Sequence, residues 1–239
     1  MTRIIFFALL VLSACGTRKS ETANAPPNQL TEQEKTEGWK LLFDGQTMNG
    51  WRFFKNKEND TWEVQNGTLH SKPITETDGT HRADLITADQ YANFELVLDW
   101  KVSPKGNSGI IYRVTEEFEV SYGSGPEYQI IDDINYPGKL KPENTTGGNY
   151  DMQVPQNKTL NPSGEWNSTK IVVNGNHVEH WLNGNKLLEY ELGSEEWRKM
   201  VAASKWKDYP GYGLAKIGYI ALQDHGHEAW FRNIKIKPL

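Results

Sequence analysis

Apolar residues recur at every second position along much of this chain, which is the period of a β-strand. The longest such run consists of Phe94, Leu96, Leu98, Trp100 and Val102, with charged residues at most of the positions between them. This pattern predicts a strand with one buried face and one solvent-facing side. Shorter runs with the character of strands follow at 108–114, 127–132, 218–223 and 230–237.

Asn-Gly pairs separate several further strand-like runs, and this dipeptide is the one that best fits a two-residue hairpin turn. Asn66-Gly67 lies between the runs 62–65 and 68–71, which predicts a first hairpin. A second group of hairpin strands is predicted at 171–173, 177–182 and 186–192, with Asn174-Gly175 and Asn183-Gly184 as its turns.

One short helix interrupts this β pattern. Ser194 is suited to cap it, Glu195 and Glu196 lie in its first turn, and Trp197, Met200 and Val201 mark one face. The Gly-, Pro- and Asn-rich stretch 136–162 is expected to be a long structured loop, a kind of segment that is often functional. Many short strands without βαβ alternation predict an all-β fold, a two-sheet sandwich of the jelly-roll type with one short helix.

The N-terminal residues have the layout of a secretory signal, with Arg3 followed by an apolar run from Ile4 to Leu12. This run is too short to span a bilayer, which takes roughly 20 apolar residues. Leu12-Ser13-Ala14-Cys15 resembles a bacterial lipobox, in which lipid is attached to the cysteine. The alternative is an ordinary signal peptide with a chance cysteine, but Cys15 is the only cysteine among 239 residues. A lone cysteine forms no disulfide within its own chain, so this residue needs another role.

These features divide the chain into three parts. Residues 1–14 are expected to be a lipoprotein signal peptide, and the polar segment 15–36 is expected to be a lipidated flexible tether. Residues 37–239 are expected to form one jelly-roll domain. A lipid anchor would place the protein in the cell envelope, with the outer membrane favoured because Gly16, not Asp, follows the cysteine.

Composition narrows the class of partner. The net charge is −5 and the pI is about 5.7, so the chain has no basic stripe for nucleic acid. It contains nine Trp and ten Tyr residues, and such rings serve sugar-handling proteins as platforms for pyranose rings. Most of them are nevertheless expected to be core residues.

Eight groups of segments stand in a characteristic order along the chain. They are Gly38–Gly45 with Gly50-Trp51, Asn107–Arg113, Gly125–Asp132, Gly147–Asp151, Gly164–Asn167, Val178–Gly184, Leu222–Gly226 and Trp230–Ile234. Taken together, they resemble the bacterial 3-keto-disaccharide hydrolase domain family over about Gly38 to Leu239. This resemblance implies a concanavalin-like jelly roll that breaks down glycosides oxidised at carbon 3.

Alternation along the strands sorts the residues of these segments into two faces. Glu127 and Gln129 share one face of their strand, and Arg113 belongs to a face of the run 108–114. Gln223 and His225 lie opposite Ile220 and Leu222, whose apolar side chains are expected to face the core. The predicted substrate groove therefore contains the side chains of Glu127, Gln129, Arg113, Gln223 and His225. A β-bulge would break this assignment.

Two chemistries fit this groove. Ordinary glycoside hydrolysis needs two carboxyl groups, and Glu127 would then pair with Glu179 as the best available partner. A 3-keto sugar also permits elimination, in which a base removes the proton on carbon 2 and the aglycone leaves before water adds. This route needs one base, Glu127 or His225, and a group that stabilises an oxyanion, Arg113 or a metal ion. The residues favour elimination because only one carboxylate is well placed.

Further side chains complete the predicted substrate-binding set, namely Trp181 as a sugar platform or a packing residue, Asn107 and Tyr150. His180 is expected to be a hydrogen-bonded core residue. No cysteine or histidine cluster indicates zinc, but Asp132-Asp133 could contribute to a site for a hard divalent cation such as Ca²⁺ or Mg²⁺.

The sequence therefore predicts a lipid-anchored enzyme that acts on small glycosides. The alternatives are a non-catalytic carbohydrate-binding module and a scaffold lipoprotein. A catalyst is expected to have a partly buried Glu or His with a shifted pKa, whereas a binding module is expected to have a shallow aromatic groove. A scaffold would carry a broad exposed apolar patch.

Overall fold

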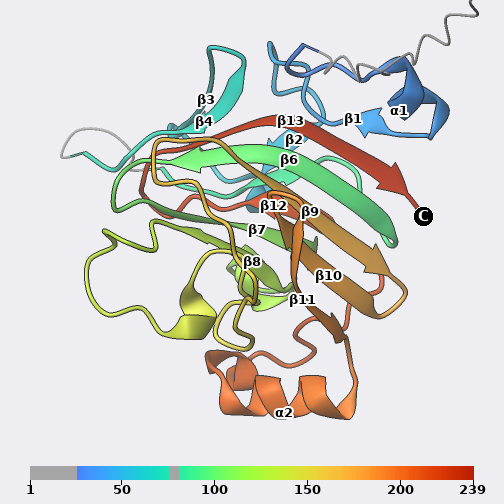
Figure 1. Ribbon diagram of the computed structural model, residues 1–239, viewed down its shortest axis with the longest axis vertical. Helices are drawn as coiled ribbons and strands as arrows, with labels where there is room; N and C mark the ends of the chain where they lie inside the picture. The colour runs from blue at the N-terminus through green and yellow to red at the C-terminus, as the bar shows by residue number, and fades with distance from the viewer. Residues whose placement is uncertain (1–25, 76–80) are drawn as a thin grey trace, which may run out of the picture.

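The computed structural model describes residues 26–75 and 81–239, which form a sandwich of two antiparallel sheets (Figure 1). The prediction of an all-β jelly-roll sandwich is confirmed. The predicted signal peptide and its Cys15 lie outside the described residues. No helix in the described part of the chain is long and apolar enough to cross a membrane.

The larger sheet has eight strands in the order β11-β10-β9-β6-β13-β4-β3, and β1 pairs with β13. These strands are β1 (Lys40–Leu41), β3 (Trp62–Gln65), β4 (Thr68–Ser71), β6 (Phe94–Val102), β9 (Asn167–Asn174), β10 (His177–Leu182), β11 (Asn185–Glu191) and β13 (Ala229–Pro238). The predicted hairpins are present, and Asn66 and Gly67 have φ angles of 50° and 75°. Both values lie in the left-handed region that a type I′ turn requires.

The smaller sheet has five strands in the order β2-β5-β12-β7-β8. They are β2 (Trp51–Phe53), β5 (Leu85–Thr87), β12 (Tyr219–Leu222), β7 (Asn107–Val114) and β8 (Glu127–Ile131). The alternation pattern did not predict β1, β2 or β5, because two or three residues are too few to show a period of two.

The hydrophobic core lies between the two sheets and follows the alternation predicted for β6. Phe94, Leu96, Leu98, Trp100 and Val102 are all buried, and the residues between them are partly exposed. The inward face of the smaller sheet supplies Ile110, Tyr112, Tyr128, Ile130, Ile220 and Leu222 to the same core.

The outward face of the smaller sheet is also covered, so that every residue of β7 and β8 is buried. Loops with the short 3₁₀ turns η2 (Ser121–Gly123) and η4 (Lys205–Asp208) lie over this face. Residues 147–150 add main-chain hydrogen bonds along the outer edge of β8. This covered outward face holds the candidate site.

The predicted helix is present as α2 (Glu195–Ala203), and the Ser194 side chain caps it by accepting from the Trp197 amide. Trp197 stacks on Tyr190 and Tyr212, which ties the helix to the sandwich. Two further 3₁₀ turns, η1 (Phe54–Asn56) and η3 (Pro142–Asn144), lie in loops.

The structure corrects the predicted extent of the tether, because residues 28–36 of that segment are folded against the domain. A second helix, α1 (Glu32–Thr36), begins with a capping box formed by Thr31 and Glu34. Asn28 is only 8% exposed and exchanges two hydrogen bonds with Asn233 of β13, at 2.7 and 2.8 Å. Composition alone missed this contact, since one polar residue with a long-range partner leaves no periodic pattern.

Replacing Asn28 with Ala is expected to lower the free energy of unfolding by about 1–3 kcal/mol, because the Asn233 amide would lose its acceptor. The neighbouring exposed Gln29 provides the control, and Gln29→Ala should leave stability unchanged. Urea denaturation of both variants measures the difference, and equal midpoints would contradict the role of Asn28.

Candidate active site

Glu127 opens β8 and points outward from the smaller sheet, where it is 4% exposed. Its carboxyl group lies over Gly109 of the adjacent strand β7. A Cβ atom at position 109 would stand 2.7 Å from Glu127 Oε1. Only glycine therefore leaves the space that this carboxyl group occupies.

Burial, together with the negative charge of Asp84, raises the pKa of Glu127 to about 8. Lys205 and a hydrogen bond from Gln223 act in the opposite direction but do not offset the loss of hydration. Glu127 is therefore a neutral carboxylic acid near neutral pH, able to donate a proton.

Two glutamines flank Glu127 on the same face, as the alternation predicted. Gln129 is 1% exposed, and its Oε1 accepts from the Ile130 amide. Gln223, just after β12, is 7% exposed, and its backbone N–H donates to Gly109 O. Gln223 Oε1 is buried without a hydrogen-bond partner in the described part of the structure. A ligand hydroxyl group could donate to it.

His225 and Asn107 lie farther along the same face. Asn107 Nδ2 is 3.3 Å from His225 Nε2, and the Asn107 Oδ1 atom is buried without a partner among the described residues. Partial burial lowers the pKa of His225, as do the nearby His227, Arg82 and Lys205. The imidazole is therefore neutral near neutral pH. A neutral imidazole can accept a proton.

Tyr150 and Lys205 lie close enough to Glu127 to interact with it electrostatically, beside the outward face that corresponds to the predicted groove. The backbone amide of Tyr150 donates to Glu127 O at 3.1 Å. Lys205 Nζ lies 4.2 Å from the centre of the Tyr150 ring. An adjoining pocket of about 500 Å³ is lined by Lys205 together with Tyr122, Trp206, Asp208 and Tyr209.

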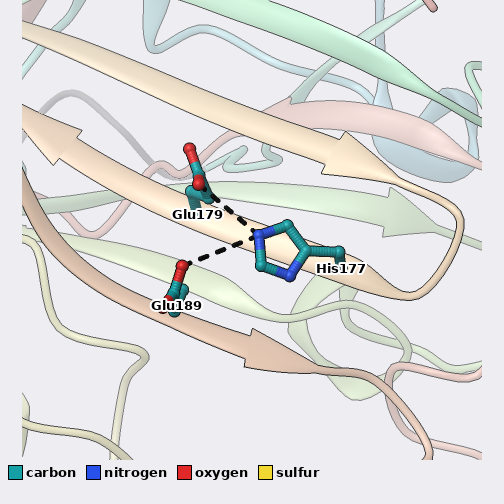
Figure 2. Close-up of side chains that lie close together, drawn as sticks. All are labelled: His177, Glu179 and Glu189. Atoms are coloured by element: carbon teal, nitrogen blue, oxygen red, sulfur yellow. Dashed lines mark hydrogen bonds and ion pairs between the residues drawn. The ribbon is translucent and has the colours of Figure 1, made fainter.

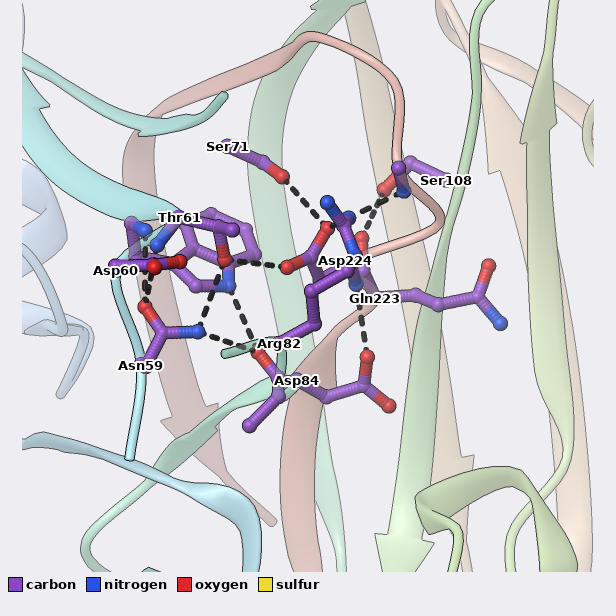
Figure 3. A network of polar contacts seen from close by, with 12 residues as sticks. Asn59, Asp60, Thr61, Ser71, Arg82, Asp84, Ser108, Gln223 and Asp224 are labelled. Atoms are coloured by element: carbon purple, nitrogen blue, oxygen red, sulfur yellow. Dashed lines mark hydrogen bonds and ion pairs between the residues drawn. The ribbon is translucent and has the colours of Figure 1, made fainter. Parts of the chain in front are cut away.

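A buried polar network around Asp224 supports the floor of the groove (Figure 3). The Asp224 carboxylate is fully buried, accepts from Thr61 Oγ1 at 2.5 Å and from Ser71 Oγ at 3.2 Å, and pairs with Arg82. Its backbone amide donates to Asp84. Figure 3 shows the neighbouring Gln223 side chain extending away from this carboxylate.

Arg113 does not lie in the groove, contrary to the prediction. The pairing of β7 with β12 shifts register between Tyr219 and Ala221, and Arg113 has a φ angle of 55°. This bulge turns the side chain away, and its guanidinium donates to Ala92 O and Gly175 O at 3.2 and 2.5 Å. Arg113 ties two loops together and does not contact the groove.

The prediction also placed Glu179 and Trp181 with Glu127 in the groove, and the structure does not. They lie on the outward face of β10 in the larger sheet, because Val178, His180 and Leu182 occupy its core face. The sandwich therefore separates them from Glu127. Alternation correctly predicted that Glu179 and Trp181 share one face of their strand, but it does not determine which of the two sheets the strand joins.

The described residues contain one group suited in composition to hold a metal ion, formed by His177, Glu179 and Glu189 on this outer face (Figure 2). Lys186 already pairs with both carboxylates of the group, at 3.4 and 2.7 Å. The group lies on the opposite side of the sandwich from Glu127.

The Asp132 carboxylate, a predicted calcium ligand, caps the turn after β8 by accepting from the Ile134 and Asn135 amides.

His180 is a buried hydrogen-bonded residue, as predicted. Its Nε2 lies 2.8 Å from Tyr112 Oη and its Nδ1 lies 3.0 Å from Gly147 O. Burial lowers its pKa to about 4.

The sequence did not indicate Asp84 or Lys205. Asp84 precedes the three-residue strand β5, and Lys205 begins the turn η4. Neither segment has a periodicity from which a face could be assigned. Burial raises the pKa of Asp84 to about 6, and Ser121 Oγ donates to it.

Replacing Glu127 with Gln is expected to change how stability depends on pH. The folded state holds the Glu127 proton more tightly than the unfolded chain, so the wild type loses stability as pH rises from about 4.5 to about 8. Glu127→Gln should lack this part of the loss and gain stability relative to wild type above pH 8. Urea denaturation across this range measures it, and parallel profiles would contradict the raised pKa.

Comparisons with known proteins agree with this geometry. Residues 38–237 match the model of the 3-keto-alpha-glucoside-1,2-lyase-like domain. A 3-keto-disaccharide hydrolase of Bacteroides thetaiotaomicron is 37% identical over 231 residues, which cover 85% of this chain and 79% of that protein.

Two crystal structures from Parabacteroides distasonis, both of proteins classed as glycosyl hydrolases, are also similar. The first has a TM-score of 0.82 and 41% identity and covers 90% of this chain and all of its own. The second has a TM-score of 0.62 and 30% identity, with 80% of this chain covered. On the match over 38–237, this chain belongs to the family of 3-keto-alpha-glucoside-1,2-lyase-like domains.

Proposed function

We propose that this protein cleaves 3-keto-glycosides by elimination followed by addition of water. The observation that carries the proposal is the opposite displacement of two pKa values in one groove. The pKa of Glu127 is raised to about 8, and the pKa of His225 is lowered. Such a pair supplies an acid and a base at the same pH.

His225 acts as the base. Its imidazole removes the proton from carbon 2 of the sugar, and the electrons of the broken C–H bond form a double bond to carbon 3. The negative charge moves to the oxygen on carbon 3. When the carbonyl group on carbon 3 re-forms, the electrons of the double bond between carbons 2 and 3 move to form a double bond between carbons 1 and 2. The bond from carbon 1 to the aglycone oxygen then breaks.

Glu127 acts as the acid and gives its proton to the departing oxygen, which would otherwise leave as an alkoxide. Water then adds at carbon 1 and a proton returns to carbon 2, so the net reaction is hydrolysis. Glycoside hydrolysis of the ordinary kind would need a second carboxylate across the bond. The Asp84 carboxyl group is already held on both oxygens, by Ser121 Oγ and by the Asp224 amide, so it is poorly placed for this role.

Unpaired acceptors in the groove support a sugar as the ligand. Gln223 Oε1 and Asn107 Oδ1 are both buried without partners among the described residues. A buried acceptor without a donor costs about 1–3 kcal/mol, and the hydroxyl groups of a sugar would satisfy both. The alternative of a binding module explains the acceptors but gives no reason for a protonated buried carboxyl group.

The test is incubation with a 3-keto-disaccharide in D₂O. Elimination and readdition should place deuterium on carbon 2 of the released 3-keto sugar, whereas direct hydrolysis should leave hydrogen there. A sample without enzyme corrects for spontaneous exchange. Glu127→Gln and His225→Ala should each lower kcat by roughly 100-fold or more. Cleavage without deuterium on carbon 2 would overturn the proposal.

The rate should also depend on pH in a bell shape. Activity is expected to fall at low pH as His225 becomes protonated and to fall above about pH 8 as Glu127 loses its proton. The Glu127→Gln variant, though slow, should lose the alkaline limb. A retained alkaline limb in that variant would assign it to another group.

We further propose that Cys15 carries lipid and holds the enzyme at the cell envelope, in the outer membrane. The apolar run followed by Leu12–Cys15 and the lack of any other cysteine support this proposal. Metabolic labelling with a fatty acid should mark the wild type but not Cys15→Ser. Equal labelling of both forms would overturn the proposal.

A further inference from the structure

Lys205 is held in an unusual position at the edge of the groove. It begins η4, its backbone amide donates to Asp151 Oδ2 at 2.9 Å, and Ser204 caps the turn. Its Nζ lies 4.2 Å from the Tyr150 ring centre, 4.3 Å from that of Trp206 and 5.6 Å from that of Tyr122. The aromatic rings fix this ammonium group by cation–π attraction.

No carboxylate in the described part of the chain lies within ion-pair distance of Lys205 Nζ. The carboxyl groups that act on it from farther away are Glu127 and Asp151. Although the residue as a whole is exposed, the rings remove much of the water around the ammonium, and this desolvation lowers its pKa. A lysine on an ordinary surface would be hydrated or paired. Here the charge is available to a ligand.

The two carboxyl groups that act on Lys205 are themselves paired or neutral. Asp151 Oδ1 lies 3.3 Å from Lys141 Nζ, and Glu127 is neutral near neutral pH, since its pKa is about 8. Lys205 lines a pocket of about 500 Å³ together with Tyr122, Trp206, Asp208 and Tyr209. A cation that forms no ion pair within the described residues is suited to an oxygen that gains negative charge during reaction.

We propose that Lys205 is a catalytic residue whose ammonium group donates a hydrogen bond to the oxygen on carbon 3 of the sugar. This inference rests on the elimination proposed above. As the carbon 2 proton passes to His225, the carbonyl electron pair moves onto this oxygen, and Lys205 stabilises the resulting enediolate. Lys205 keeps its proton throughout, so the proton balance between His225 and Glu127 is unchanged.

Lys205→Met tests the assignment, because methionine keeps an unbranched apolar side chain across the rings and removes only the charge. We expect kcat on a 3-keto-glycoside to fall by about 10²–10³-fold, with a small change in KM. Lys205→Arg should recover part of the loss. Lys207→Met is the matched control, since Lys207 is an exposed lysine of the same turn, and it should retain full activity.

Exchange of the carbon 2 proton on free 3-keto-glucose in D₂O separates the possible roles, because this sugar has no aglycone. Lys205→Met should slow this exchange as much as it slows cleavage. Exchange at the wild-type rate, or a change confined to KM, would overturn the catalytic role and leave elimination intact. Cleavage by the wild type without any exchange at carbon 2 would overturn elimination and this role together.

Discussion

Burial of the Asp224 carboxylate is the constraint on which the candidate site depends. This charge has no contact with solvent, and it is held by Arg82 and by two hydroxyl groups from the start and the end of the β3–β4 hairpin region, Thr61 and Ser71. Removing one partner of a buried charge typically costs about 3–5 kcal/mol, so the inward direction of Asp224 is strongly fixed. Gln223 extends away from this carboxylate, and His225 contacts Asn107, so both neighbours of Asp224 are directed to the other side, toward the candidate site.

The same network affects the acid, Glu127, through Asp84. The Asp224 amide donates to Asp84, and the negative charge of Asp84 helps to keep Glu127 protonated. The fold therefore fixes the direction of the base and contributes to the protonation of the acid through neighbouring groups. Gly109 adds the space in which the Glu127 carboxyl lies. Stability and chemistry are coupled here, because the buried groups that fix the direction of the base also favour the protonated acid.

Alternation predicted the common face of Glu127, Gln129, Gln223 and His225 correctly, because regular strands place every second residue on one side. It failed at Arg113, where one bulged residue with a left-handed backbone reverses the direction of the side chain. It also could not decide that Glu179 belongs to the other sheet. That choice depends on strand order, which arises from packing of segments far apart in the sequence.

The position of Lys205 could not be predicted from the sequence. Its position depends on a turn that is capped by Ser204 and held by Asp151, and on three rings, two of which (Tyr122 and Tyr150) come from distant parts of the chain. None of these contacts has a period or a motif. The candidate site combines a neutral acid, a neutral imidazole and a lysine ammonium group that forms no ion pair in the described part of the chain. That distribution suits a reaction in which a neutral ketone becomes an anion, since the positive charge is already in place before the substrate acquires its negative charge.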